Sequence, residues 1–225
     1  MYKYSAIMSV KNGEKFIEES IESILNQSIK PSEIIVIMDL CTDNTEKILE
    51  KYRKDLTIVK NSLSEKGGLP YSLNKGITLA KNEYISFLDS DDIWTTNKNQ
   101  IQIEIMEENQ LVEVVSSNTV NFSGEVSEQD LDTLVKRSVT TRLLNSSTFR
   151  KKTFQNYGLL DGDNHFSFIA SWWINAMKKG VNLHKTKDLV LLRRIHEKNS
   201  WVTGAEKGRN QISLAIRKIV QDNAK

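Results

Sequence analysis

Three aspartates lie close together in the segment Asp89-Ser90-Asp91-Asp92. They follow an apolar run at residues 84–88 that is typical of a buried strand. Carboxylates in such a place repel one another and lose hydration unless a cation lies among them. Hard oxygen ligands favour Mg²⁺ or Mn²⁺, which they share with the phosphates of a substrate. An acidic loop that caps a helix beginning near Thr96 is the alternative, and the motif alone does not decide.

The first half of the chain alternates strand-like and helix-like segments. Strands are predicted at residues 4–10, 33–38, 56–60 and 84–88, and helices at 14–27, 44–52, 71–80 and 96–109. This alternation predicts an α/β fold with a Rossmann-like, mostly parallel sheet flanked by helices. Ligands bind such sheets at the carboxyl ends of the strands. Polar clusters follow three of these strands, at residues 9–12, 39–43 and 89–92.

The second half is less regular. Strands are predicted at residues 112–117, 119–122, 146–149 and 188–195, and helices at 150–157, 166–179 and 211–220. Between them, the polar residues 123–132 are expected to form a loop that leads into a short helix.

Charge and cysteine content limit the partners and the compartment. A formal net charge of +2 gives no sign of a nucleic-acid partner. Only basic charges occur between residues 136 and 160, at Lys136, Arg137, Arg142, Arg150, Lys151 and Lys152. A solvated helix face accounts for them, and an anionic acceptor or peripheral membrane contact is the alternative. Cys41 is the only cysteine, and no run reaches the length of a membrane span, so we expect a cytoplasmic protein.

Several segments follow one another in a familiar order. They are residues 7–16 with 20–27, 33–39 with 42–45, 68–69 with 73–77, and 82–94, which contains the aspartates. In this order they resemble the family 2 glycosyltransferases with the A-type nucleotide-sugar fold. The resemblance implies metal-dependent transfer of a sugar from a nucleotide-diphosphate donor, most simply a UDP-sugar, with inversion. The metal would be Mn²⁺ or Mg²⁺.

The same resemblance implies roles for the polar clusters. Ser9 and Val10 would flank the base of the nucleotide, and Asp39 would accept a hydrogen bond from it. Asp89 and Asp91 form a DxD pair, of which one would reach the ribose and the other the metal. Asp92 would hold a neighbouring segment in place. Met38 stands where the family commonly has a further aspartate, so base recognition rests on fewer polar groups.

Residues 191–200 resemble an Arg-Arg-x-His-x-x-Asn segment found late in some family members. This implies His196 as a third metal ligand and Arg193 or Arg194 as a clamp on the diphosphate. The alternative is a strand end with exposed arginines and a capping histidine.

The general base departs from the family pattern. Members usually carry an aspartate at the start of the helix before the late strand, where this chain has Ile169 and Ser171. The nearest groups able to accept a proton are Asp163, Asp161 and His165, and Asp163 is our first choice. Two alternatives remain open: an acceptor such as a thiol that needs no base, and a protein that binds the donor without turnover. Of the adjacent Trp172 and Trp173, Trp172 is our candidate for stacking on a sugar, with a buried pair as the alternative.

We therefore expect a single domain with a smaller acceptor-side lobe. Its parts are a nucleotide-sugar-binding half at residues 1–110, an acceptor-side half at 111–204 and a C-terminal helix at 205–225. The acceptor is a glycan, a lipid-linked glycan, a peptide or a small molecule, and homo-oligomerisation is left open. A nucleotidyltransferase would want a glycine-rich phosphate loop, and residues 9–13 offer a single glycine.

Overall fold

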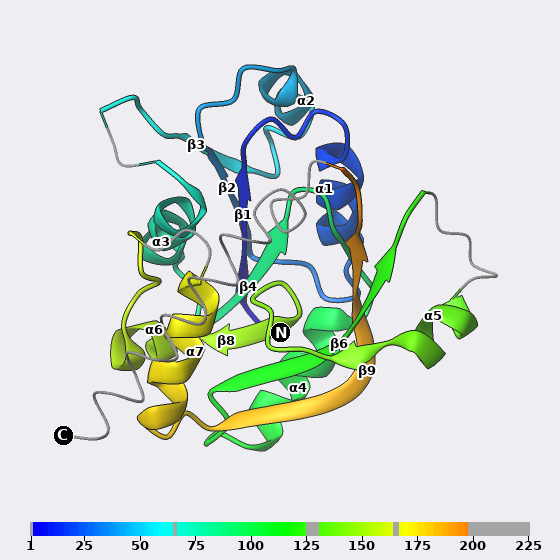
Figure 1. Cartoon of the computed structure of the whole chain (residues 1–225), viewed down its shortest axis with the longest axis vertical. Helices are drawn as coiled ribbons and strands as arrows, with labels where there is room; N and C mark the ends of the chain where they lie inside the picture. The colour runs from blue at the N-terminus through cyan, green and yellow to red at the C-terminus, as the bar shows by residue number, and fades with distance from the viewer. Residues whose placement is uncertain (1, 65–66, 125–130, 164–166, 198–225) are drawn as a thin grey trace.

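One sheet runs through the whole molecule in the order β3-β2-β1-β4-β8-β6-β9-β5, with β7 paired to β6 (Figure 1). The computed structural model describes residues 2–64, 67–124, 131–163 and 167–197. The strands are β1 Tyr4–Val10, β2 Glu33–Met38, β3 Thr57–Lys60, β4 Tyr84–Asp89, β5 Ile93–Trp94, β6 Val114–Phe122, β7 Val139–Thr140, β8 Ser147–Arg150 and β9 Leu183–Arg194. The helices are α1 Ile17–Leu25, α2 Thr45–Glu50, α3 Leu69–Leu79, α4 Lys98–Glu108, α5 Leu131–Arg137, α6 Lys152–Tyr157 and α7 Phe168–Lys178.

The strands β3, β2, β1 and β4 are parallel, so their carboxyl ends lie at the same edge of the sheet. Ser9 of β1 pairs with Ile37 on one side and with Asp89 on the other. The predicted polar clusters therefore emerge next to one another. The predicted α/β class with a helix-flanked sheet is confirmed. Beyond β4 the sheet becomes mixed, because β8 is antiparallel to both β4 and β6, whereas β9 is parallel to β6.

Alternate residues of β1 enter two different cores, as the period of a strand requires. Met8 packs on the face covered by α1 and α4, whereas Ile7 packs on the face covered by α3 and α7. Figure 1 shows α3 and α7 together on the left of the sheet, with α1 on the other side. Gly76 allows α3 to lie close to β1, because a Cβ atom there would be 2.4 Å from Ile7 Cγ2. Both faces of the central strands β1, β2 and β4 are thus covered within the part of the chain that the structure describes.

The elements of the second half differ from the prediction in several places. The two strands expected at residues 112–117 and 119–122 are one strand, β6, whose register with β9 shifts between Ser116 and Thr119. The strand β9 begins five residues before the predicted position 188, at Leu183. The two-residue strands β5 and β7 were not predicted, since so short a segment leaves no periodic pattern. The predicted helix at 211–220 lies outside the described residues.

The basic segment at 136–160 is not one continuous charged surface. Arg150 is 2% exposed, forms an ion pair with Glu83 and donates from Nε to the Val112 carbonyl at 3.0 Å. Lys151 donates to the Ala80 carbonyl at 2.5 Å. These two residues therefore hold the sheet together instead of facing a membrane. Among the helices of the described ranges, none combines the length and apolar character needed to cross a membrane.

The predicted boundary near residue 110 falls between α4 and β6. The antiparallel pairing of β4 with β8 carries the sheet across that point, so both halves share one domain. The division into halves by function stays a prediction.

Candidate functional site

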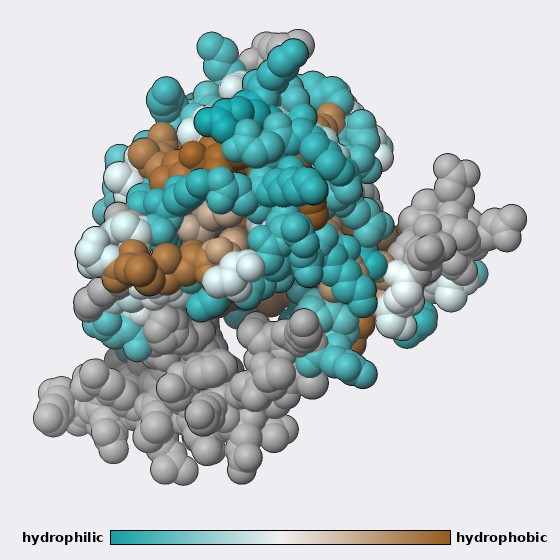
Figure 2. Space-filling view, turned by 90° about the horizontal axis from the view of Figure 1, so that it is seen from above, coloured by the Kyte–Doolittle hydropathy of each residue, from teal (hydrophilic) through white to brown (hydrophobic). Residues whose placement is uncertain are grey.

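A cavity of about 1150 Å³ opens at the carboxyl ends of β1, β2 and β4. Its lining residues are Ser9, Lys11, Asn12, Gly13, Glu14, Lys15, Phe16, Asp39, Asp43, Gly68, Leu69, Asp89, Ser90, Asp91, Asp92, Arg193, His196 and Glu197. Figure 2 views the molecule from this end, where hydrophilic side chains dominate and the hydrophobic patches lie mainly towards one side. The three polar clusters predicted from the sequence all contribute to this lining.

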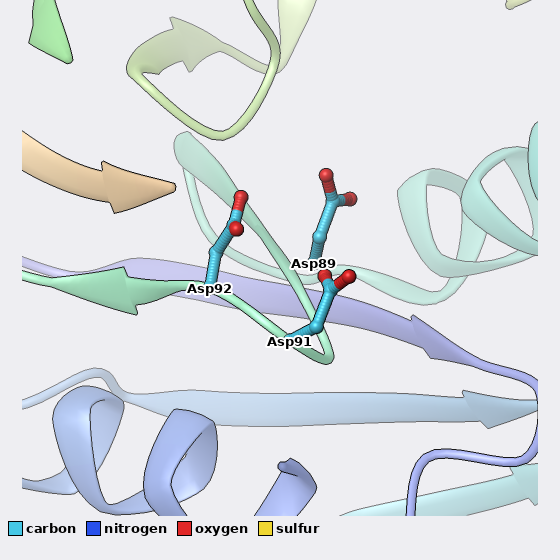
Figure 3. A group of neighbouring side chains, drawn as sticks. All are labelled: Asp89, Asp91 and Asp92. Atoms are coloured by element: carbon cyan, nitrogen blue, oxygen red, sulfur yellow. The ribbon is translucent and has the colours of Figure 1, made fainter. Parts of the chain in front are cut away.

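The aspartates occupy a tight turn after β4, in which Asp92 N donates to the Asp89 carbonyl at 3.2 Å. One carboxylate oxygen from each lies within 4.8 Å of the others. Figure 3 shows the three side chains on the same side of the turn. Burial, reinforced by the Asp91 carboxylate and opposed by Arg193, raises the pKa of Asp89 to about 7. The pKa of Asp92 is also raised well above its ordinary value, by burial and by the two neighbouring carboxylates. The cluster is therefore short of positive charge.

Asp92 differs from the other two because its carboxylate is engaged with the protein on both sides. Its Oδ1 accepts from Arg194 N at 2.9 Å, and its Oδ2 accepts from Asn145 Nδ2 at 2.6 Å. The side chain is 2% exposed. Asp92 thus ties the turn to β9, as expected of a residue that holds a neighbouring segment, and Asp89 and Asp91 are better placed for a ligand.

The end of β9 brings a histidine to the aspartate turn. His196 Nε2 lies 3.0 Å from Asp91 Oδ2, and the His196 ring packs on the Phe16 ring with 4.9 Å between centroids. An imidazole nitrogen and carboxylate oxygens are both common ligands of divalent metals. The structure therefore groups the predicted ligands Asp89 and Asp91 with Asp92 and places His196 directly beside Asp91, although His196 is not part of the group of three carboxylates.

The two adjacent arginines of β9 lie in different surroundings. Arg193 lines the cavity, and its positive charge offsets part of the rise in the pKa of Asp89. Arg194 does not line it and is 6% exposed; its Nε donates to the Asp91 carbonyl at 3.0 Å, and it forms an ion pair with Glu19. Its guanidinium also lies over the Phe16 ring, 4.7 Å from the centroid. Successive residues of a strand face opposite sides, so only one of the pair can face the cavity.

Asp39 lies at the other end of the cavity, where the protein fixes its carboxylate. Oδ1 accepts from Asn61 Nδ2 at 3.2 Å, and Oδ2 accepts from Gly68 N at 2.9 Å. Ser9 also lines the cavity. Val10 does not; it is 2% exposed and packs beneath Gly13, where a Cβ atom would come within 2.6 Å of Val10 Cγ2.

Of the residues predicted as a base, the two that the structure describes lie outside the cavity lining. Asp161 and Asp163 are exposed, and Asp163 Oδ1 accepts from Tyr71 Oη at 2.5 Å. Their loop is held against α3 by Asn74, which exchanges hydrogen bonds of 2.8 and 3.0 Å with the backbone of Leu160. His165 lies outside the described residues.

The two tryptophans of α7 form the buried pair that was the alternative to sugar stacking. Trp172 is 3% exposed, packs on Phe149 and Phe154, and donates from Nε1 to the Gly158 carbonyl at 2.7 Å. Trp173 is 5% exposed and donates to the Arg142 carbonyl at 2.5 Å. Neither lines the cavity.

A family model for glycosyl transferase family 2 matches residues 5–172. That range holds β1 from Ser5 onwards, β2, β3 and β4, and every lining residue except Arg193, His196 and Glu197. The chain belongs to glycosyl transferase family 2.

Curated relatives in this family carry glycosyltransferase names. The chain is 27% identical, over 233 residues, to the Campylobacter jejuni GalNAc(5)-diNAcBac-PP-undecaprenol beta-1,3-glucosyltransferase, covering 98% of this chain and 74% of that protein. It is 38% identical over 105 residues to the putative teichuronic acid biosynthesis glycosyltransferase TuaG of Bacillus subtilis, covering 46% of this chain and 42% of TuaG. The chain thus aligns with less than half the length of TuaG.

Solved structures of family-like proteins share the fold. S. aureus TarS 1–349 in complex with UDP-GlcNAc superposes with a TM-score of 0.71 at 20% identity, covering 95% of this chain and 66% of the TarS 1–349 chain. The mannosyltransferase PcManGT of Pyrobaculum calidifontis, in complex with GDP-Man and Mn²⁺, gives 0.70 at 16% identity, covering 95% and 64%. These likenesses establish the A-type glycosyltransferase fold. The chain spans about two thirds of each solved protein.

Two groups of lining residues escaped the sequence reasoning. The loop after β1 contributes Gly13, Glu14, Lys15 and Phe16 in addition to the predicted cluster at residues 9–12. Its position directly after a parallel strand could have predicted that it lines the cavity. Glu197 follows the predicted His196 directly. Asn145, which contacts two of the aspartates, gave no signal, because it lies in a loop of the antiparallel part of the sheet.

Proposed function

We propose that this chain transfers a sugar from a nucleotide-diphosphate donor, with a UDP-sugar as first candidate, to an acceptor nucleophile with inversion. The supporting observation is that one cavity collects Asp39 after β2, Ser9 of the neighbouring β1, and Asp89, Asp91, Arg193 and His196 beyond it. Those are the groups a base, a ribose and a metal-bound diphosphate require. The chain's membership in glycosyl transferase family 2 supports the same reaction.

The donor set around Asp91 fits a divalent metal. Asp89, Asp91 and His196 offer carboxylate oxygens and an imidazole nitrogen, and the raised pKa of Asp89 indicates a place that lacks positive charge. Mn²⁺ or Mg²⁺ suits such ligands, and these three residues would hold it. When bound, the ion would stabilise the negative charge of the departing diphosphate as a Lewis acid.

The chain's own groups would orient the donor. Asp39 is held by Asn61 and Gly68, so its carboxylate has a fixed direction, and carboxylate oxygens keep further acceptor capacity for an N–H of the base. Arg193 is the arginine in the lining, and it would bind the diphosphate through paired N–H donors. Ser9, paired in register with Asp89, lies between these two groups.

Asp163 remains our first candidate for the general base, with Asp161 and His165 as substitutes. Its loop is fixed by Tyr71 and Asn74 to α3, whose first residue, Leu69, lines the cavity. A carboxylate held on this side of α3 is the group that would accept the proton of an acceptor hydroxyl. For the acceptor, the name of the Campylobacter jejuni relative favours a saccharide carried on a diphosphoundecaprenol lipid.

Donor binding without turnover is the second candidate function. It is favoured by the lining itself, because the described residues of α6, α7 and the loop between them contribute no acidic group to the cavity. A base-independent acceptor such as a thiol would fit the same observation. A nucleotidyltransferase gains no support from the family match.

The release of nucleoside diphosphate from UDP-sugars, measured with Mn²⁺ and with or without a lipid-linked saccharide, tests the proposal. We expect release that depends on Mn²⁺ and is lost by about 1,000-fold in Asp91→Asn, since several kcal/mol of charge stabilisation disappear. Mn²⁺-dependent donor binding with no release under any condition would instead establish the binding function. Failure of both UDP- and GDP-sugars to bind would refute the proposal.

A further inference from the structure

Asn145 joins two of the three aspartates through a single nitrogen. Its Nδ2 lies 2.9 Å from Asp89 Oδ2 and 2.6 Å from Asp92 Oδ2. The side chain comes from the loop between β7 and β8 and is 4% exposed. It does not line the cavity, so its contact with the site passes only through the carboxylates.

A primary amide is well suited to this place. Its nitrogen carries two hydrogens, one for each carboxylate, and ionised carboxylates can only accept. The amide therefore weakens the repulsion between the Asp89 and Asp92 carboxylates, because its N–H groups lie between them, and it adds no charge. It also fixes the rotation of the Asp89 carboxylate, since Oδ2 is held and Oδ1 makes no hydrogen bond within the described ranges.

The protein holds Asn145 independently of any ligand. Trp94 Nε1 donates to the backbone carbonyl of Asn145 at 3.0 Å, and Trp94 is 3% exposed. The Trp94 ring is in turn covered by Lys98, whose Nζ lies 4.5 Å from the ring centroid. The backbone of Asn145 is thus fixed behind Asp89 by a buried tryptophan, and the Asn145 amide reaches both carboxylates from this held position.

We infer that Asn145 is a positioning residue, which sets the direction of the Asp89 carboxylate for metal binding. The inference rests on the proposed function, because it requires Asp89 and Asp91 to bind a divalent cation. Groups that orient metal ligands by hydrogen bonds change metal affinity by about 10- to 100-fold when removed. Removal of Asn145 is expected to act on cation affinity first and on turnover through it.

Titration calorimetry of the whole chain with MnCl₂ and UDP, with no sugar transfer taking place, tests the inference. Asn145→Leu has similar volume and no donor, and it is expected to weaken Mn²⁺ binding by at least about 10-fold. The matched control is Asn118→Leu. Asn118 is 8% exposed and bridges Ser138 and Thr140 at 2.9 and 2.6 Å, remote from the aspartates. Both variants lose a buried amide bridge, but only Asn145→Leu should lose Mn²⁺ affinity.

A smaller change keeps the test decisive if Asn145→Leu does not fold. Asn145→Ser retains one donor, which can serve only one carboxylate. Its Mn²⁺ affinity should lie between that of the wild type and that of Asn145→Leu. If the Asn145 variants bind Mn²⁺ as tightly as the wild type, the positioning role is overturned and the proposed function stands. A wild-type protein that takes up no Mn²⁺ with UDP would overturn both.

Discussion

The parallel half of the sheet and the mixed half contribute to the cavity in different ways. Strands β1, β2 and β4 deliver lining residues wherever they end, because parallel strands finish at a common edge. Within the described ranges, the mixed half reaches the cavity only at the end of β9, through Arg193, His196 and Glu197. The lining therefore comes mainly from the ends of the parallel strands, and the mixed half mainly supports these residues.

That support comes from residues behind the lining. Asn145 contacts Asp89 and Asp92, and Arg194 binds the Asp91 carbonyl and Glu19. Each joins the mixed half to the aspartate turn without facing the cavity. The comparison thus separates two kinds of residue, those that would touch a donor and those that hold the first kind in place.

Within this comparison, the largest expected effect concerns the general base, a role for which the parallel half offers no candidate. If Asp163 accepts the acceptor proton, Asp163→Asn should lower turnover by about 100-fold or more, since a positioned base contributes that much. Donor affinity should stay close to that of the wild type, because Asp163 does not line the cavity. Steady-state rates together with donor titration measure both.

Asp161→Asn is the matched control for this prediction, since it changes an exposed carboxylate of the same loop. Tyr71→Phe is a second one, because it removes the 2.5 Å hydrogen bond to Asp163 and leaves the carboxylate. Unchanged turnover in Asp163→Asn would exclude this residue, and a loss in Asp161→Asn instead would move the role to its neighbour.

The two arginines of β9 provide an intermediate test. Arg193→Gln should weaken donor affinity by about 10-fold, the equivalent of one charge-assisted hydrogen bond of about 1.5 kcal/mol, with little change in stability. Arg194→Gln should lower the free energy of unfolding by about 2 kcal/mol, because buried bonds to backbone carbonyls and to Glu19 are lost. Donor titration and urea unfolding of both variants separate the two effects. The reverse outcome would show that Arg194 serves as the clamp.

The aspartates, the arginines and Asn145 show which parts of the site could be predicted from the sequence. An apolar strand followed by aspartates is a local pattern, so the position of Asp89 and Asp91 at a sheet edge could be predicted. The sequence also placed an arginine and His196 near them, but not which arginine, because the facing of β9 depends on its register with β6. The bridge from Asn145 joins segments more than fifty residues apart through side chains alone. No local pattern marks such a contact.

The smallest effect lies where the two halves meet. Lys98 is fully buried and donates to Gln102 Oε1 at 2.9 Å and to Thr148 Oγ1 of β8 at 3.1 Å, with Ser86 of β4 within 3.4 Å. Burial lowers the pKa of Lys98 well below 10.5. Folding then favours the neutral amine, so the stability from this group is present above the unfolded pKa and is lost as the pH falls towards the folded one.

The free energy of unfolding should therefore rise between pH 8 and pH 10 in the wild type, with a slope of at most one proton. Lys98→Met keeps the aliphatic stem and should remove that rise, whereas Lys179→Met, at an exposed position, should keep it. Tyr4, whose pKa is raised by burial, acts in the opposite direction above about pH 10, and Cys41, whose pKa burial raises from 9.0, does so within this pH range. Both act equally in wild type and variant, so the difference between their slopes reports on Lys98. Urea unfolding at several pH values measures the slopes. Equal slopes in wild type and Lys98→Met would mean that Lys98 stays charged where β4 and β8 meet. Its hydrogen bonds to Ser86, Gln102 and Thr148 would then stabilise a buried cation between the two halves.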